Sequence, residues 1–260
     1  MPSTESSTAL STCKSVLGTG FPGDTLLAFH SFQAITFDCY GTLIDWESGI
    51  LRVLRPLLAE HGKPVDHEEI LELYAELEPA IQAAKYEPYR VVLEEIMRGV
   101  GQHYGFSVST DEARSLAASL RNWVPFPDTV RALQALKSKY RLGIISNTDD
   151  RLFAETAPHL QVTFDWVITA EQAGAYKPAR AIFELALKKI GLPAKKILHV
   201  GQSVFHDVIP ARQLGMSTVL VTRRGPGAVK RVVAKPDLEV PDLRTLAQMA
   251  VGAGSASRAV

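Results

Sequence analysis

The sequence predicts an α/β fold, in which helices cover both faces of a parallel sheet and a helical segment is inserted after the first strand. Short apolar runs of strand length alternate with helix-like segments, a pattern typical of a buried parallel sheet. One long helical stretch interrupts this alternation between the first two runs. The five predicted strands cover residues 34–38, 142–146, 166–169, 197–200 and 218–221.

The helices are predicted from the spacing of their apolar residues. Segments 129–139, 179–190 and 208–214 separate or follow the predicted strands. In the inserted stretch, Leu51, Leu54, Leu57 and Leu58 recur at helical spacing. We therefore expect residues 47–123 to form a helical lid that excludes water from a strand-end site and helps to select the substrate.

The remaining segments are assigned by composition. We predict the catalytic core in residues 34–46 and 124–250, on either side of the insertion. Residues 1–33, which begin with a stretch rich in Ser, Thr and Gly, are predicted to be a flexible N-terminal extension rather than a secretory signal. Residues 251–260 are predicted to be a flexible tail.

Charge and cysteine content narrow the class of partner. The chain has 260 residues and a formal net charge of +0, so we expect neither nucleic acid nor an anionic membrane as a partner. No apolar run approaches the roughly 18 residues of a membrane span. Cys13 and Cys39 lack metal-ligand spacing, and we expect a cytoplasmic location. We expect a small-molecule substrate as the partner. The sequence leaves open whether the chain forms a homodimer.

Asp38 is the strongest candidate for a reacting group. It ends the apolar run Ala-Ile-Thr-Phe-Asp, and Gly41 then turns the chain. Ligands of open α/β sheets bind beyond the carboxyl ends of the strands. A carboxylate in that position can attack carbon or phosphorus and form an ester that water later cleaves.

Further polar residues follow other predicted strands or precede a helix. A nucleophilic carboxylate needs a positive charge beside it, which Lys177 can supply, and hydrogen-bond donors around the group under attack. Asp207 could accept a hydrogen bond from Lys177 or position water for the second step. The candidate donors are Thr42, Ser146 and Asn147.

This ordered set resembles the haloacid dehalogenase superfamily of aspartate-nucleophile hydrolases. The resemblance is carried by residues 37–43, 146–147, 177–178 and 201–207. It implies a Rossmann-like core with a helical cap after the first motif. By motif, Asp38 corresponds to the nucleophile, Lys177 to the charge stabiliser and Asp207 to the last acidic residue. Thr42, Ser146 and Asn147 correspond to binding groups.

Two positions separate the branches of that superfamily. Its magnesium phosphatases carry an Asp two places after the nucleophile, which protonates the leaving alkoxide, and this chain has Tyr40 there. They carry a metal-binding Asp in the fourth motif, where this chain has Gln202 followed by Ser203. A halide leaves without a proton, so the pattern is similar to the metal-independent L-2-haloacid dehalogenases. We count Tyr40, Gln202 and Ser203 among the substrate-binding residues.

The sequence thus predicts a metal-independent hydrolase of the 2-haloacid dehalogenase type, with no metal site and no cofactor. One alternative is a phosphatase with an atypical general acid, which would use Mg²⁺. Another is a diverged biosynthetic or binding protein on the same scaffold. The cap stretch in which the dehalogenases carry a substrate-binding arginine offers Ala80, and Lys85 or Arg90 could substitute for it. His206, next to Asp207, is an open candidate for a site contact.

Overall fold

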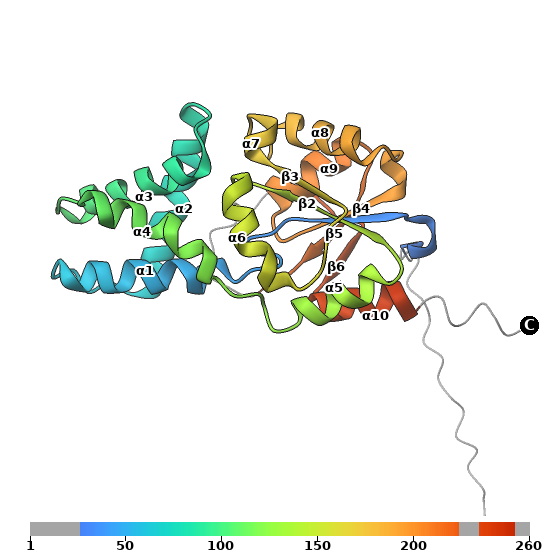
Figure 1. The fold of residues 1–260 in the computed structure, drawn as a ribbon, viewed down its shortest axis with the longest axis horizontal. Helices are drawn as coiled ribbons and strands as arrows, with labels where there is room; N and C mark the ends of the chain where they lie inside the picture. Colours follow the sequence, from blue (N-terminus) through green and yellow to red (C-terminus); the bar gives the residue numbers. More distant parts are fainter. Residues whose placement is uncertain (1–26, 224–233, 253–260) are drawn as a thin grey trace, which may run out of the picture.

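The protein consists of an α/β core and a helical cap (Figure 1). The structure is a computed structural model and describes residues 27–223 and 234–252. The core sheet has six strands in the order β3-β2-β1-β4-β5-β6, and every neighbouring pair is parallel. The predicted fold class, a Rossmann-like parallel sheet with a helical cap inserted after the first strand, is confirmed.

The predicted strands form where apolar runs are buried on both faces. Every residue of the central strands β1 and β4 is buried, as expected for a sheet with helices on both sides. The sixth strand was not predicted, because only three residues form it and its central Glu239 is exposed. The strands are β1 (Ala34–Phe37), β2 (Arg141–Ser146), β3 (Trp166–Thr169), β4 (Ile197–Gly201), β5 (Ser217–Val221) and β6 (Leu238–Val240).

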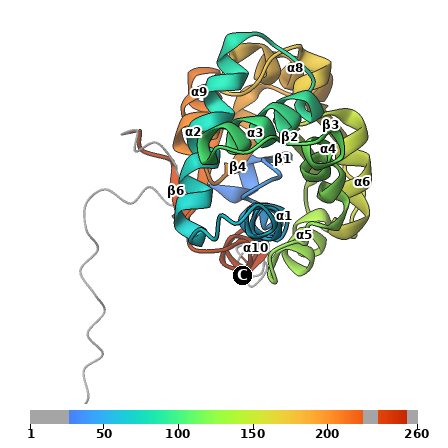
Figure 2. The same ribbon diagram turned by 90° about the vertical axis from the view of Figure 1, so that its left-hand side faces the viewer.

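Two groups of helices cover the sheet. Helices α5, α6 and α10 lie on one face and α7, α8 and α9 on the other (Figures 1 and 2). A single turn of π-helix, Val204–Val208, leads into α9. The core helices are α5 (Thr129–Lys137), α6 (Asp150–Leu160), α7 (Ala170–Ala173), α8 (Arg180–Ile190), α9 (Ile209–Gln213) and α10 (Leu243–Gly252).

The cap is a bundle of four helices in front of one end of the sheet (Figure 2). It follows the loop after β1, so it covers the carboxyl ends of the strands. The two connections between cap and core run side by side, since Asp45 N donates to Val124 O at 2.9 Å and Phe126 N donates to Leu43 O at 3.0 Å. The cap helices are α1 (Trp46–Glu60), α2 (His67–Ala84), α3 (Tyr89–Tyr104) and α4 (Thr110–Ser119).

The core begins earlier than predicted. Residues 1–33 were assigned to a flexible extension, but Phe29 and Phe32 are buried in the core, and Phe29–Ser31 forms a 3-10 turn. The rest of that extension, residues 1–26, lies outside the described residues, as does most of the predicted tail. None of the helices in the described ranges combines the length and apolarity needed to cross a membrane.

Candidate active site

The topology brings three predicted motifs to one edge of the sheet. β1 lies between β2 and β4, so the segments that follow these strands are neighbours. Asp38 follows β1, and its backbone N donates to Val200 O on β4 at 2.9 Å. Gly201, at the end of β4, permits a close approach: a Cβ there would lie 2.4 Å from the carboxyl carbon of Asp207.

Lys177 connects the two predicted catalytic carboxylates. Its Nζ donates to Asp38 Oδ1 and to Asp207 Oδ1, both at 2.7 Å, and to Ile145 O at 3.0 Å. The side chains of Lys177 and Asp207 are only 2% and 1% exposed, whereas that of Asp38 is 12% exposed. Asp38 is therefore the carboxylate of the pair that a bound molecule can reach.

The two carboxylates have opposite pKa shifts. Burial raises the pKa of Asp38, because it outweighs the attraction of Lys177, and the charge of Asp207 adds to the rise. Burial acts in the same sense on Asp207, but Lys177 and a hydrogen bond from His199 hold the pKa of Asp207 below its usual range. Burial opposes the charge of Lys177, yet both carboxylates together raise its pKa. The cluster thus contains a charged lysine, a firmly ionised Asp207 and an Asp38 that protonates more readily.

Neighbouring residues hold this cluster in place. Asn147 clamps the Lys177 backbone, since Lys177 N donates to Asn147 Oδ1 at 2.7 Å and Asn147 Nδ2 donates to Lys177 O at 3.2 Å. Thr42 Oγ1 donates to Asp38 Oδ2 at 2.8 Å and accepts from Gln202 N at 2.9 Å. The predicted residues Asp38, Thr42, Asn147, Lys177 and Asp207 therefore form one connected network.

His199, which flanks the fourth motif but was not predicted as a site residue, belongs to the same network. His199 Nε2 lies 3.2 Å from Asp207 Oδ1, and its Nδ1 lies 2.9 Å from Thr36 Oγ1. His199 is on β4 and is buried. Alternation along the strand could have indicated that it points to the same side as the site, but no sequence pattern links it to Asp207. His206, which the sequence left as a candidate for a site contact, lines the cavity described below.

The other predicted binding residues have different surroundings. Tyr40 OH is 2.8 Å from Thr156 Oγ1. Ser146 Oγ is buried and has no hydrogen-bond partner among the described residues. Ser203 Oγ accepts from His206 N at 3.1 Å, so it caps the turn that follows β4. The Gln202 side chain packs against Gly41, where a Cβ would lie 2.2 Å from Gln202 Oε1 and where φ is +95°.

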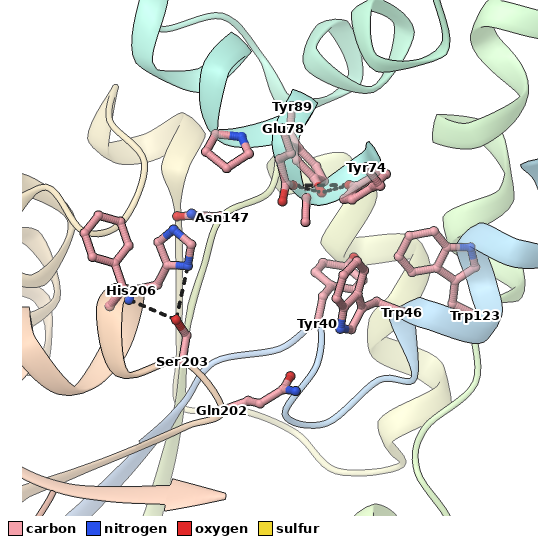
Figure 3. A pocket seen from close by; sticks show the side chains of 13 residues that line it. Tyr40, Trp46, Tyr74, Glu78, Tyr89, Trp123, Asn147, Gln202, Ser203 and His206 are labelled. Atoms are coloured by element: carbon pink, nitrogen blue, oxygen red, sulfur yellow. Dashed lines mark hydrogen bonds between the residues drawn. The ribbon is translucent and has the colours of Figure 1, made fainter. Parts of the chain in front are cut away.

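A cavity of about 160 Å³ lies between the core and the cap (Figure 3). Its core wall comes from the segments that follow β1, β2 and β4. Its cap wall comes mainly from α2 and from the start of α3. The lining residues are Tyr40, Trp46, Tyr74, Ala75, Glu78, Pro79, Tyr89, Trp123, Asn147, Gln202, Ser203, Phe205 and His206.

A carboxylate with two tyrosine hydroxyls around it lies on the cap wall, and it was not predicted from the sequence. Tyr89 OH donates to Glu78 Oε1 at 2.7 Å, Tyr74 OH donates to the same oxygen at 3.2 Å, and the two hydroxyl oxygens are 3.1 Å apart (Figure 3). Tyr74 and Glu78 are one helical turn apart on α2, a spacing that could have suggested the pair. The packing of α3 on α2 adds Tyr89, which the sequence alone does not indicate.

Ala80, at the expected place of the cap arginine, and the two candidate cations Lys85 and Arg90 all lie away from the cavity. Ala80, Lys85 and Arg90 are exposed, and none of the three lines the cavity. Lys85 Nζ instead donates to Glu87 Oε1 at 2.9 Å. In the described part of the chain, no lysine or arginine side chain lines the cavity.

The donor set fits a magnesium ion poorly. Mg²⁺ requires octahedral oxygen ligands, usually including carboxylates, but Lys177 Nζ already lies between the two carboxylates that could serve. Gln202 offers a carboxamide at the position where the phosphatases carry their metal-binding Asp. Within residues 27–223 and 234–252, no group of three or more His, Cys, Asp or Glu side chains is arranged to hold a metal ion.

The geometry agrees with the comparison to known proteins. A family model described as haloacid dehalogenase-like hydrolase matches residues 32–215. The chain belongs to the haloacid dehalogenase-like hydrolase family. The match includes the whole cap and every residue of the Asp38 network, so the predicted family and the prediction of an enzyme are confirmed.

Relatives of this haloacid dehalogenase-like hydrolase include enzymes of two kinds. A glyceraldehyde 3-phosphate phosphatase from Methanothermobacter thermautotrophicus is 30% identical over 84% of this chain and 97% of its own. An (S)-2-haloacid dehalogenase from Pseudomonas fluorescens is 28% identical over 84% of this chain and 95% of its own. The solved L-2-haloacid dehalogenase from Xanthobacter autotrophicus superposes with a TM-score of 0.72 at 21% identity, over 85% of this chain and 99% of that one.

Proposed function

We propose that this protein is a metal-independent hydrolase of the 2-haloacid dehalogenase type, in which Asp38 attacks carbon. The observation that carries the proposal is Tyr40, which stands where the phosphatases carry their general acid and whose hydroxyl is 2.8 Å from Thr156 Oγ1. Lys177 Nζ, 2.7 Å from both Asp38 and Asp207, balances the charge of the nucleophile, whose side chain is 12% exposed, and no metal is required for that task.

The proposed reaction has two steps. A carboxylate oxygen of Asp38 forms a bond to the substrate carbon while the carbon–halogen bond breaks, and halide leaves with the bonding electrons. Water then attacks the carboxyl carbon of Asp38, which releases the hydroxylated product and a proton and restores the carboxylate. Asp207 is a weak base because its pKa is low, so its contribution is to hold Lys177 in place rather than to take a proton from water.

The surroundings of Tyr40 support a leaving group that needs no proton. Tyr40 stands at the position of the phosphatase general acid, but its hydroxyl is engaged with Thr156. Burial raises the pKa of Tyr40 further above its usual value, which moves it away from the range useful for acid catalysis at neutral pH.

Turnover in ¹⁸O-labelled water tests the proposal. With enzyme in excess over (S)-2-chloropropionate or an N-alkyl chloroacetamide, we expect ¹⁸O to enter Asp38, as detected by mass spectrometry of the peptide that contains it. Product formed at an unchanged rate by Asp38→Asn, without label in the protein, would contradict an aspartyl ester.

The phosphatase alternative is favoured by one observation, the 30% identity to a glyceraldehyde 3-phosphate phosphatase. Under this alternative an acid other than Tyr40 protonates the leaving oxygen, and Mg²⁺ supports the phosphoryl group. Phosphate release from an aryl phosphate that requires Mg²⁺ and stops with a chelator would favour it. Halide release that is unaffected by the chelator would favour the first proposal.

A further inference from the structure

We infer that the cap wall of the cavity, formed by Glu78 with Tyr74 and Tyr89, selects substrates that carry an ammonium group rather than a carboxylate. This inference rests on the proposed function, because it names the class of substrate whose carbon Asp38 would attack. It departs from a simple 2-haloacid, whose carboxylate needs a positive partner.

The first observation is the arrangement around the Glu78 carboxylate. Two tyrosine hydroxyls donate to Oε1, at 2.7 Å from Tyr89 and 3.2 Å from Tyr74, and no described residue donates a hydrogen bond to Oε2. Burial raises the pKa of both tyrosines well above the usual value, and the charge of Glu78 adds to the rise, so the hydroxyls stay protonated. The cluster therefore fixes the carboxylate and keeps one of its oxygens available to a donor from the substrate.

The second observation is the balance of charge around the cavity. Lys177, the cation of the active-site cluster, already pairs with both Asp38 and Asp207. Within residues 27–223 and 234–252, the ionisable side chains that line the cavity, apart from tyrosines, are Glu78 and His206. A carboxylate in this cavity would meet the negative charge of Glu78, and among the described residues that line the cavity only His206 could oppose it.

The third observation is the aromatic character of the remaining walls. Trp46, Trp123, Tyr40 and Phe205 line the same cavity as Glu78, and Figure 3 shows Trp46 and Tyr40 beneath the Tyr74–Glu78–Tyr89 cluster. The faces of aromatic rings attract organic cations, most strongly when water is excluded. A carboxylate among such rings is a suitable environment for an alkylammonium group.

The pKa of Glu78 is consistent with this assignment. Burial raises the pKa of Glu78, the hydrogen bonds from Tyr89 and Tyr74 oppose the rise, and the charge of Asp38 adds to it. An ionised Glu78 is therefore held at a free-energy cost in the absence of a cation, and a bound ammonium would reduce that cost.

Three chloroacetamides of similar size test the inference with the unmodified protein. N-(2-aminoethyl)-2-chloroacetamide carries an ammonium group, N-propyl-2-chloroacetamide is neutral, and N-(chloroacetyl)glycine carries a carboxylate. We expect kcat/KM for chloride release to be at least about tenfold higher for the ammonium compound than for the neutral one, and lowest for the carboxylate. Equal values, or a preference for the carboxylate, would overturn the inference.

A pair of variants then assigns the preference to Glu78. Glu78→Gln keeps the size and removes the charge, and we expect it to lose at least about tenfold in kcat/KM for the ammonium compound but less than about threefold for the neutral one. Glu76→Gln is the matched control, because Glu76 is exposed on the same helix and does not line the cavity. An equal loss for both compounds in Glu78→Gln, or dependence of the preference on His206 alone, would contradict the assignment.

A binding measurement separates this inference from the reaction on which it rests. The three corresponding acetamides, which lack chlorine, can be titrated while tryptophan fluorescence is followed, since two of the three tryptophans, Trp46 and Trp123, line the cavity. If none of the chloroacetamides releases chloride, the proposed function fails for this class of substrate. Stronger binding of the ammonium acetamide would still support the inference, and equal binding of all three would refute it.

Discussion

The core wall and the cap wall of the cavity treat charge in opposite ways. Behind the core wall, two carboxylates share one buried lysine, and each carboxylate lies 2.7 Å from it. On the cap side, Glu78 is held by two neutral hydroxyls and by no cation among the described residues. The core wall is therefore complete before a substrate binds, whereas the cap wall is completed by the substrate. This difference suggests that the core determines the reaction and the cap determines which molecule undergoes it.

The largest effect is expected on the core side, from Asp38→Asn. The amide is a poor nucleophile, so turnover should fall at least about a thousandfold. The measurement is the rate of chloride release from the preferred chloroacetamide. Activity above about a tenth of the original would mean that another group forms the covalent bond.

The same substitution should not weaken the fold. The pKa of Asp38 in the folded protein is raised, so the stability linked to this group is present below its pKa in the unfolded chain and is lost as pH rises through the folded value. Ionisation of Asp38 is thus less favourable in the folded protein than in the unfolded chain, and removal of the carboxylate should keep or raise the melting temperature at pH 7. A melting temperature several degrees lower at pH 7 would contradict the direction of this shift.

Lys177→Met should affect both activity and stability. It leaves Asp38 and Asp207 buried without their shared cation, which typically costs about 3–5 kcal/mol in the free energy of unfolding. The pKa of each carboxylate should then rise in the folded state, so the variant should be less stable at pH 7 than at pH 5. Urea unfolding at the two pH values measures this, and addition of Asp38→Asn to the variant should restore part of the loss. A variant as stable as the original at pH 7 would show that the lysine is not the main counter-charge.

The sequence predicted the core wall far better than the cap wall, for a physical reason. Asp38, Asn147 and Gln202 each follow a strand, and the carboxyl ends of parallel strands meet at one edge whatever the details of packing. Glu78 and Tyr89 come together only because α2 packs on α3 with a particular register. The same register leaves Lys85 exposed, although its residue type suited a substrate carboxylate.

Asp149, at the start of α6 in the core, makes a direct contact with the cap. Its carboxylate accepts from Tyr89 N at 2.7 Å and from Arg90 N at 3.0 Å, and so caps the first turn of α3 from the core. Asp149→Ala should loosen the cap and lower kcat/KM about tenfold, with a loss of about 1–2 kcal/mol in stability. Steady-state kinetics and thermal unfolding measure both.

Asp150→Ala is the matched control for this link, since Asp150 bonds to Thr169 and Gln172 within the core. If the contact between Asp149 and α3 causes the loss, Asp150→Ala should keep kcat/KM within about twofold of the unmodified protein. If both variants lowered kcat/KM equally, the effect would come from the start of α6 and not from the position of Tyr89.

The smallest effect is expected from Tyr40→Phe, which removes a single hydroxyl from the core wall. Tyr40 belongs to the core wall, but its hydroxyl bonds to Thr156 and is not engaged with the carboxylate cluster. Loss of that hydrogen bond should cost about 1 kcal/mol in stability and change kcat for chloride release by less than about threefold. Thr156→Val removes the same bond from the other side and should match it in both respects. A hundredfold lower kcat in Tyr40→Phe alone would mean that the phenol acts on the leaving group, and a substrate whose departing atom needs a proton would then replace the halide.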